Sequence, residues 1–213
     1  TSTFSGDVYQ RGGVFNLTLS GKDSRAQSAI RNNGGTVNID ITGDGAQFTG
    51  SIRKMSTMYS ALRAVSAASP GQNVRLGAKA TWNVTGASDI TNLTAEGGRI
   101  VQQSDGVLNI KNYTGKATVF YEGTADKDGK LTLAKNGKVQ VQNVTGTKNH
   151  LTFATKAFGE SEEAEKKVAA ALAGQFRYTG DRAANIKNNA LKNLDLDVVI
   201  GEGILKSEVT YRM

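Results

Sequence analysis

A segment near the N-terminus repeats after 22 residues. Residues 12–19, GGVFNLTL, return at residues 34–41 as GGTVNIDI, with Asn16 in the place of Asn38 and apolar residues in matching positions. Each copy is a glycine turn followed by alternating apolar and polar residues, which is typical of a strand buried on one face. A period of about 20–30 residues with a strand in each repeat indicates a stacked β-solenoid. Such a fold offers a long, stiff surface without a ready-made catalytic pocket, so the repeat favours binding or structure over catalysis.

Short segments of alternating polarity continue along the chain. They predict strands over residues 15–20, 36–42, 46–52, 74–84, 90–95, 99–103, 107–113, 117–121, 130–134, 138–144, 151–155 and 195–200. An apolar or aromatic residue followed by Thr-Gly also recurs, and its spacing from Gly86 to Gly115 to Gly146 is compatible with coils whose loops differ in length. Residues 1–213 are therefore predicted to form a single all-β domain, a parallel β-helix.

Two stretches break this pattern and predict short α-helical insertions. Near residues 53–69, apolar side chains recur at helical spacing: Met55, Met58, Tyr59, Leu62 and Val65. Near residues 160–177, Ser161 can cap a helix whose first turn is acidic and whose apolar stripe includes Val168. We expect both helices to lie outside the solenoid and to pack on it. The methionines could also form an adaptable binding face, but burial against their own domain is the preferred interpretation.

The most specific motif lies in residues 76–94, LGAKATWNVTGASDITNLT. It resembles the pertactin-like passenger domains of bacterial autotransporters, in which a Trp-Asn-Val-Thr-Gly coil is followed by Gly-Gly, a strand and a Tyr-Thr-Gly turn. Residues 97–101 and 108–115 of this chain fill those later places. Three further stretches resemble elements of such passengers more loosely: residues 41–50, 169–179 and 199–203.

The resemblance implies a right-handed parallel β-helix that is exported through the outer membrane of a Gram-negative bacterium. Such a passenger is displayed extracellularly, at the cell surface, as a non-enzymatic virulence-associated adhesin, or as the stalk that carries another head. The implied partners are host or neighbouring-cell surface molecules, either protein or glycan, and other copies of the chain through self-association. The chain departs from the family by its two helical insertions and by lacking the outer-membrane barrel, which is expected of a segment of a longer protein.

Composition narrows the classes of function. Cysteine is absent, which excludes disulfides, iron–sulfur ligation and cysteine nucleophiles and is compatible with export. The net charge is +7, but the Lys and Arg residues are scattered and not interleaved with aromatics, so we expect contact with anionic glycans or cell surfaces rather than nucleic acid. No apolar stretch is long enough for a transmembrane segment, and no cofactor or metal site is expected.

Three polar elements are candidate sites. His150 is the only histidine, and without a serine-nucleophile motif it is interpreted as a surface residue at the start of a strand. Asp195 and Asp197 alternate with apolar residues and would project from one strand face, as the paired acids of a glycoside hydrolase or polysaccharide lyase do. A solvated strand face is preferred, and a β-helical carbohydrate-active enzyme is the alternative. Residues 126–130, DKDGK, predict a hairpin or turn rather than a calcium loop.

Asparagine followed two residues later by threonine recurs on the predicted strands. The five instances begin at Asn16, Asn83, Asn92, Asn112 and Asn143. They match the sequon for N-glycosylation, but in a bacterial solenoid they are more simply polar residues on strands that end in threonine.

Overall fold

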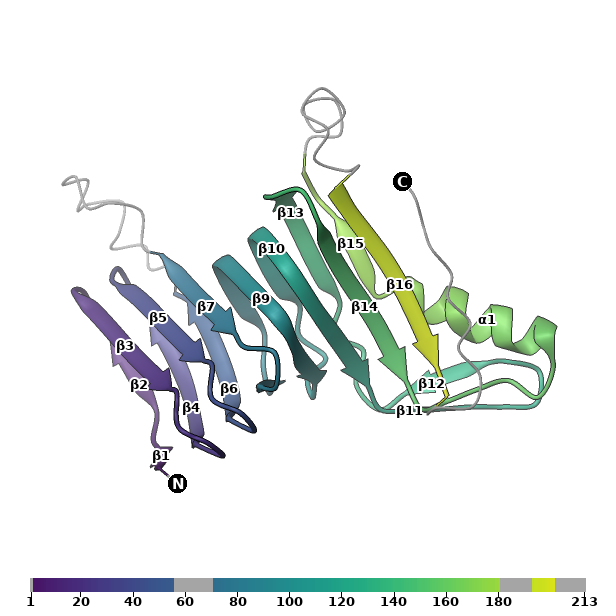
Figure 1. Cartoon of the computed structure of the whole chain (residues 1–213), viewed down its shortest axis with the longest axis horizontal. Coiled ribbons are helices and arrows are strands. Elements are labelled where there is room, and N and C mark those ends of the chain that lie inside the picture. The colour runs from purple at the N-terminus through teal and green to yellow at the C-terminus, as the bar shows by residue number, and fades with distance from the viewer. Residues whose placement is uncertain (1, 56–70, 181–192, 202–213) are drawn as a thin grey trace.

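The computed structural model describes residues 2–55, 71–180 and 193–201. In this part of the chain, fourteen strands pair into one sheet that winds as a stack of coils along the long axis of the molecule (Figure 1). The strand pairs of this sheet are parallel, so the predicted parallel stacking is confirmed, in a chain that is mostly β with one helix among the described residues. No helix among the described residues is both long enough and apolar enough to cross a membrane.

The sheet strands are β1 (Thr3–Ser5), β2 (Val8–Gln10), β3 (Val14–Leu19), β4 (Arg25–Asn32), β5 (Thr36–Ile41), β6 (Gln47–Lys54), β7 (Gln72–Leu76), β8 (Thr81–Val84), β9 (Ser88–Gln102), β10 (Leu108–Tyr121), β13 (Val139–Val144), β14 (Asn149–Thr155), β15 (Phe176–Tyr178) and β16 (Leu194–Ile200). Two elements lie outside the sheet: a hairpin of β11 (Gly123–Ala125) with β12 (Leu131–Leu133), and the helix α1 (Glu162–Ala173).

The 22-residue repeat corresponds to one coil. Strand β3 pairs with β5 over its whole length, which sets Asn16 beside Asn38 and Leu17 beside Ile39. The alternation therefore has the predicted effect, because every second residue of β5 is buried and the residues between them face outward.

The paired strands form three columns along the stack. Column A contains β1, the first halves of β4 and β6, β8, the last residues of β9 and β10, then β14 and β16. Column B contains β2 with the ends of β4 and β6, and then the first residues of β9 and β10 with β13 and β15. Column C contains β3, β5, β7, the middle of β9 and of β10, and the end of β13.

The core is built from side chains that stack on one another inside each column. In column A the stack is Ala26, Phe48, Trp82, Ile100, Val119, Phe153 and Val198, and all seven are buried. In column C the stack includes Leu17, Ile39, Val74, Leu93, Tyr113 and Val144. The indole Nε1 of Trp82 donates to the carbonyl oxygen of Gly50 at 3.1 Å, so its one polar group is satisfied in the core.

Several predicted strand boundaries are wrong, because corners between columns are turned in different ways. Residues 74–84 form two strands, β7 and β8, separated by a turn at residues 77–80. Conversely, β9 and β10 each run through a corner where two strands were expected. Residues 130–134 do not form part of a coil but overlap β12 of the hairpin.

The predicted Thr-Gly spacing is right for one step and wrong for the other. The hydroxyls of Thr114 and Thr145 hydrogen-bond to each other, so Gly115 and Gly146 follow equivalent positions of successive coils. One coil before Gly115, however, the register places Ala95 and not Gly86.

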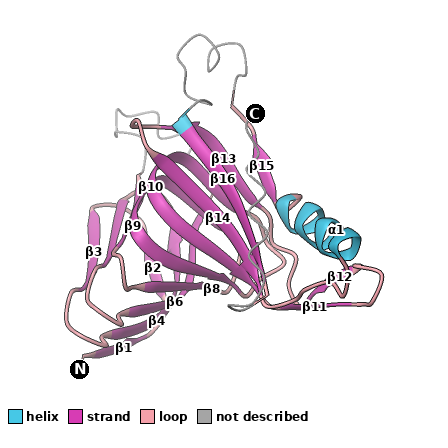
Figure 2. Ribbon diagram, turned by 45° about the vertical axis from the view of Figure 1, so that its right-hand side comes forward, coloured by secondary structure: helices cyan, strands magenta, loops and turns pink. Residues whose placement is uncertain are grey.

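The hairpin and α1 project from the same side of the stack (Figure 2). The carboxylate of Asp126 accepts hydrogen bonds from the backbone N–H groups of Asp128 and Lys130, both at 2.9 Å, which confirms a hairpin turn at DKDGK. Gly129 has a φ of 84° and lies so close to Ala164 in the first turn of α1 that a Cβ would not fit. The hairpin tip and the helix therefore support each other.

The second predicted helix is confirmed with shorter bounds. The Ser161 hydroxyl accepts from the N–H of Ala164 at 3.1 Å, as a cap should, and Val168 and Leu172 bury their side chains in the core. The first predicted helix cannot begin at residue 53, because β6 runs to Lys54, and residues 56–70 lie outside the described residues.

Candidate functional site

The outer surface of column C carries a ladder of six asparagines, one from each of six successive coils. Each Nδ2 donates to the Oδ1 of the asparagine one coil earlier: Asn38 to Asn16 (2.9 Å), Asn73 to Asn38 (2.9 Å), Asn92 to Asn73 (2.8 Å), Asn112 to Asn92 (3.0 Å) and Asn143 to Asn112 (3.3 Å). One such bond contributes about 0.5–1.5 kcal/mol net, and bonds in a chain polarise one another. The ladder therefore reinforces the register that the backbone pairing of the coils sets.

Neighbouring polar groups on column C are also paired with each other. The Arg75 guanidinium donates to the Glu96 carboxylate at 2.9 Å, and this hydrogen bond raises the pKa of Arg75 above its ordinary value. Thr114 and Thr145 share a hydrogen bond beside the asparagine ladder. These contacts use donors and acceptors that a ligand would otherwise need, so the outer surface of column C is best explained as structural.

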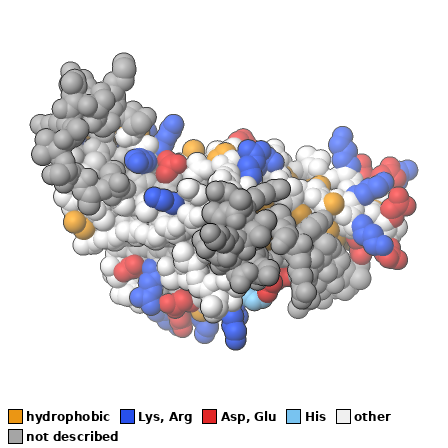
Figure 3. Space-filling view, turned by 90° about the horizontal axis from the view of Figure 1, so that it is seen from above, with side chains coloured by type: hydrophobic (Ala, Val, Ile, Leu, Met, Phe, Trp, Pro, Cys, Tyr) orange, Lys and Arg blue, Asp and Glu red, His pale blue; other side chains and the backbone are white. Residues whose placement is uncertain are grey.

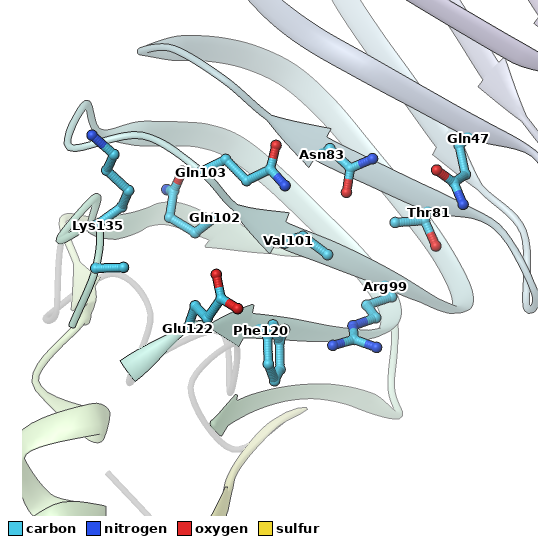
Figure 4. A pocket seen from close by; sticks show the side chains of 11 residues that line it. Gln47, Thr81, Asn83, Arg99, Val101, Gln102, Gln103, Phe120, Glu122 and Lys135 are labelled. Carbon is cyan, nitrogen blue, oxygen red and sulfur yellow. The ribbon is translucent and has the colours of Figure 1, made fainter. Parts of the chain in front are cut away.

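The outer surface of column A is hollowed by a groove of about 560 Å³ (Figure 4). Strand pairing places Gln47, Thr81 and Arg99 side by side in one row of its floor. A second row contains Asn83, Val101 and Phe120. On the hairpin side, the wall is formed by residues that follow β12, among them Lys135. The groove exists because the hairpin between β10 and β13 leaves the coil and returns beside this face.

One cation in the groove lies over an aromatic ring. The guanidinium carbon of Arg99 lies 4.1 Å from the centroid of the Phe120 ring, and Figure 4 shows Glu122 beyond Phe120 on the side away from Arg99. No carboxylate among the described residues forms an ion pair with Arg99. At the wall, the ammonium of Lys135 lies 3.9 Å from Asp105.

Most polar side chains of the groove form no hydrogen bond or ion pair with the described residues. Over residues 2–55, 71–180 and 193–201, the side chains of Gln47, Thr81, Gln103 and Glu122 form no hydrogen bond or ion pair, whereas Asn83 donates to the hydroxyl of Thr49 at 3.1 Å. The groove thus presents amides, a hydroxyl, a carboxylate and a guanidinium whose hydrogen-bonding capacity is unused.

A buried amide also lines the groove. Gln102 is 3% exposed, and its Nε2 donates to the carbonyl oxygen of Gly137 at 3.2 Å, but its Oε1 has no partner in the described part of the chain. A buried acceptor without a partner is unusual in a folded protein.

A second polar cluster brings His150 together with the pair Asp195 and Asp197, which the sequence had singled out separately from it. Strand β14 pairs with β16 so that His150 lies beside Asp195, and Thr152 lies beside Asp197. The His150 Nε2 lies 3.6 Å from the Asp195 Oδ2, and its Nδ1 lies 3.6 Å from the Asp197 Oδ2. His150 is 37% exposed near the start of β14, which confirms a surface histidine at a strand start.

The cluster lies on the same outer surface as the groove. Arg99, Thr118, Thr152 and Asp197 follow one another across neighbouring strands of column A. The two carboxylates project from one strand face, as predicted, and the imidazole lies between them, 3.6 Å from an oxygen of each. Among the described residues, no three His, Cys, Asp or Glu side chains are arranged to hold a metal ion.

Charged groups elsewhere are interleaved rather than segregated. Figure 3 shows acidic and basic side chains together at the end of the molecule where α1 lies. There Lys166 lies 2.8 Å from Glu162, and Lys167 lies 3.8 Å from Glu163. The surface at this end is therefore neither uniformly acidic nor uniformly basic.

No family model, curated protein or solved structure matches this chain.

Proposed function

We propose that this chain is a non-enzymatic segment of a surface-displayed bacterial passenger, exported through the outer membrane, whose β-solenoid serves adhesion or aggregation or acts as a stalk. The proposal includes the right-handed winding that parallel crossovers favour. Its main support is the parallel stack of coils fastened by the asparagine ladder, because a fold of this kind extends along one axis and presents continuous surfaces. The motif around Trp82 supplies the resemblance to passengers.

A display experiment tests this function. The chain would be presented on a non-adherent Gram-negative strain through an unrelated outer-membrane anchor, with the anchor alone as the control. We expect the displayed chain to cause cell aggregation or attachment to host-cell monolayers. Surface display without either effect would limit the chain to a stalk. Failure of the folded chain to reach the surface would contradict the proposal.

The cluster on β14 and β16 supports a second function, a carbohydrate-active enzyme. Asp195 and Asp197 lie on the same surface as the groove, where a bound glycan could reach them. Release of reducing ends from a panel of acidic and neutral polysaccharides would reveal such an activity, and Asp195→Asn would abolish it. Asp40→Asn, on the outer surface of column C, is the matched control. A panel without any release would leave binding as the role of this face.

A further inference from the structure

We propose that the groove on column A binds a carboxylated glycan, with the carboxylate on Arg99 and the sugar hydroxyls on the surrounding amides, Thr81 and Glu122. This inference rests on the proposed function and names a ligand class for it. A volume of about 560 Å³ falls in the range of sites for small molecules and short oligosaccharides.

The floor of the groove suits a chain that carries many hydroxyl groups. Gln47 and Thr81 stand on neighbouring strands, about 4.8 Å apart, so polar groups recur at the strand spacing across the stack. Amide side chains donate and accept, as sugar hydroxyls do, and they also match acetamido groups. Since backbone pairing holds both strands, these groups are positioned before a ligand arrives, which lowers the entropic cost of binding.

The contact of Arg99 with Phe120 points to the carboxylate. The guanidinium carbon lies 4.1 Å from the ring centroid, and the guanidinium N–H groups form no hydrogen bond or ion pair with the described residues. A guanidinium available in this way offers the paired donors that a carboxylate accepts in bidentate fashion. The net charge of +7 would also attract an anionic chain from solution.

Glu122 places a negative charge in the groove in addition to the positive charge of Arg99. This argues against a ligand that carries only negative groups. Glu122 follows the end of β10, two residues after Phe120, so the carboxylate and the Arg99 guanidinium lie on opposite sides of the Phe120 ring (Figure 4). A ligand must therefore bring a negative group to Arg99 and hydroxyl donors to Glu122. A sugar chain with a carboxylate on some of its units meets both requirements.

Calorimetric titration of the whole chain tests the assignment. The probes are oligosaccharides of hyaluronan, oligosaccharides of alginate and sialyllactose, each compared with its carboxyl-reduced form. We expect at least one carboxylated probe to bind, and to bind about tenfold more tightly than its reduced form, because a charge-assisted bidentate contact is lost. Binding of none of the three, or equal binding of the reduced forms, would overturn the proposal.

A pair of arginine variants separates the groove from general charge attraction. Arg99→Gln should weaken binding about tenfold or more, whereas Arg75→Gln, which removes the same charge from the outer surface of column C, should change it less than about twofold. Circular dichroism and thermal unfolding would show that both variants are folded. Equal losses in the two variants would contradict a site at Arg99.

The outcomes also separate this proposal from the function on which it rests. If displayed cells adhere while the purified chain binds no probe, the groove assignment fails and the adhesin stands. If the purified chain binds a probe through Arg99 while displayed cells neither aggregate nor attach, the site stands and the adhesin fails.

Discussion

The outer surfaces of columns C and A are built from the same kinds of residue and differ in how these are paired. On column C, Asn92 bonds to asparagines in both neighbouring coils, and Arg75 is tied to Glu96. On column A, Asn83 has a single partner and Arg99 rests on an aromatic ring. Strand register decides this difference, because it determines which side chain stands next to which. Polar groups that satisfy each other stabilise the stack, and polar groups without such neighbours are available to a ligand.

The largest expected effect concerns the bend at which β10 passes from column C to column A. Gly115 has a φ of 101°, and a Cβ there would collide with the carbonyl oxygen of Ala95. Gly115→Ala should lower the free energy of unfolding by about 3 kcal/mol or more, since both strain and collision must be relieved. Urea denaturation measures this change.

The equivalent glycine of the next coil provides the control. Gly146 has a φ of 94°, but the nearest atom to a Cβ would be a Thr114 methyl at 3.6 Å. Gly146→Ala should therefore cost only the conformational term, about 1–2 kcal/mol. Equal costs for the two variants would show that close approach of the coils does not matter at the bend.

Alkaline pH should weaken the core behind both surfaces. Tyr113 lies inside column C and Tyr121 inside column A, and burial raises the pKa of both phenols well above the ordinary value. The folded state then keeps protons that the unfolded state loses above pH of about 10. Below that pH, the two tyrosines should not change the free energy of unfolding. Above it, the free energy of unfolding should fall by up to about 1.4 kcal/mol per pH unit for each tyrosine.

Urea unfolding between pH 9 and pH 11 checks this dependence, and Tyr113→Phe and Tyr121→Phe assign it. Each variant should remove its own share of the slope, because phenylalanine has no proton to lose. Similar shares would show that the two columns exclude water equally. A slope that neither variant alters would contradict burial as its cause.

Features encoded by neighbouring residues could be predicted from the sequence. Alternation within β5 identified a half-buried strand, and the repeat gave its partner in β3. Ser161 and the acidic residues after it identified the start of α1, because capping is a local property. Strand limits at corners were less predictable. Whether the chain breaks or bends there depends on contacts with the adjacent coil, as at Gly115.

The two outer surfaces could not be predicted, because register between coils is not a local property. Partners in the asparagine ladder are separated by 22, 35, 19, 20 and 31 residues, so no fixed period reveals them. For the same reason, the sequence does not show that His150 lies beside Asp195, because that contact depends on the pairing of β14 with β16 as successive coils. The groove is lined by residues of four sheet strands and by residues that follow the hairpin. No single sequence motif contains all of these segments.

Breaking the ladder should have a moderate effect on stability. Asn92→Ala removes one donor and one acceptor from the middle of the ladder and should lower the free energy of unfolding by about 1 kcal/mol. Asn83→Ala, on column A, removes a single bond and should cost less. Thermal and urea unfolding measure both. If Asn83→Ala cost more, the ladder would not be what reinforces the register of the coils.

The smallest effect on stability is expected inside the groove. The Thr81 side chain forms no hydrogen bond with the described residues, so Thr81→Ala should change the free energy of unfolding by less than about 0.5 kcal/mol. Thr114→Ala is the matched change on column C, and it should cost more because the bond to Thr145 is lost. Binding should rank the two variants in the opposite order, with Thr81→Ala weakening the glycan complex and Thr114→Ala leaving it unchanged. If one variant impaired both properties, stability and binding would not be divided between the two surfaces, because a groove residue that stabilises the stack cannot also be free for a ligand.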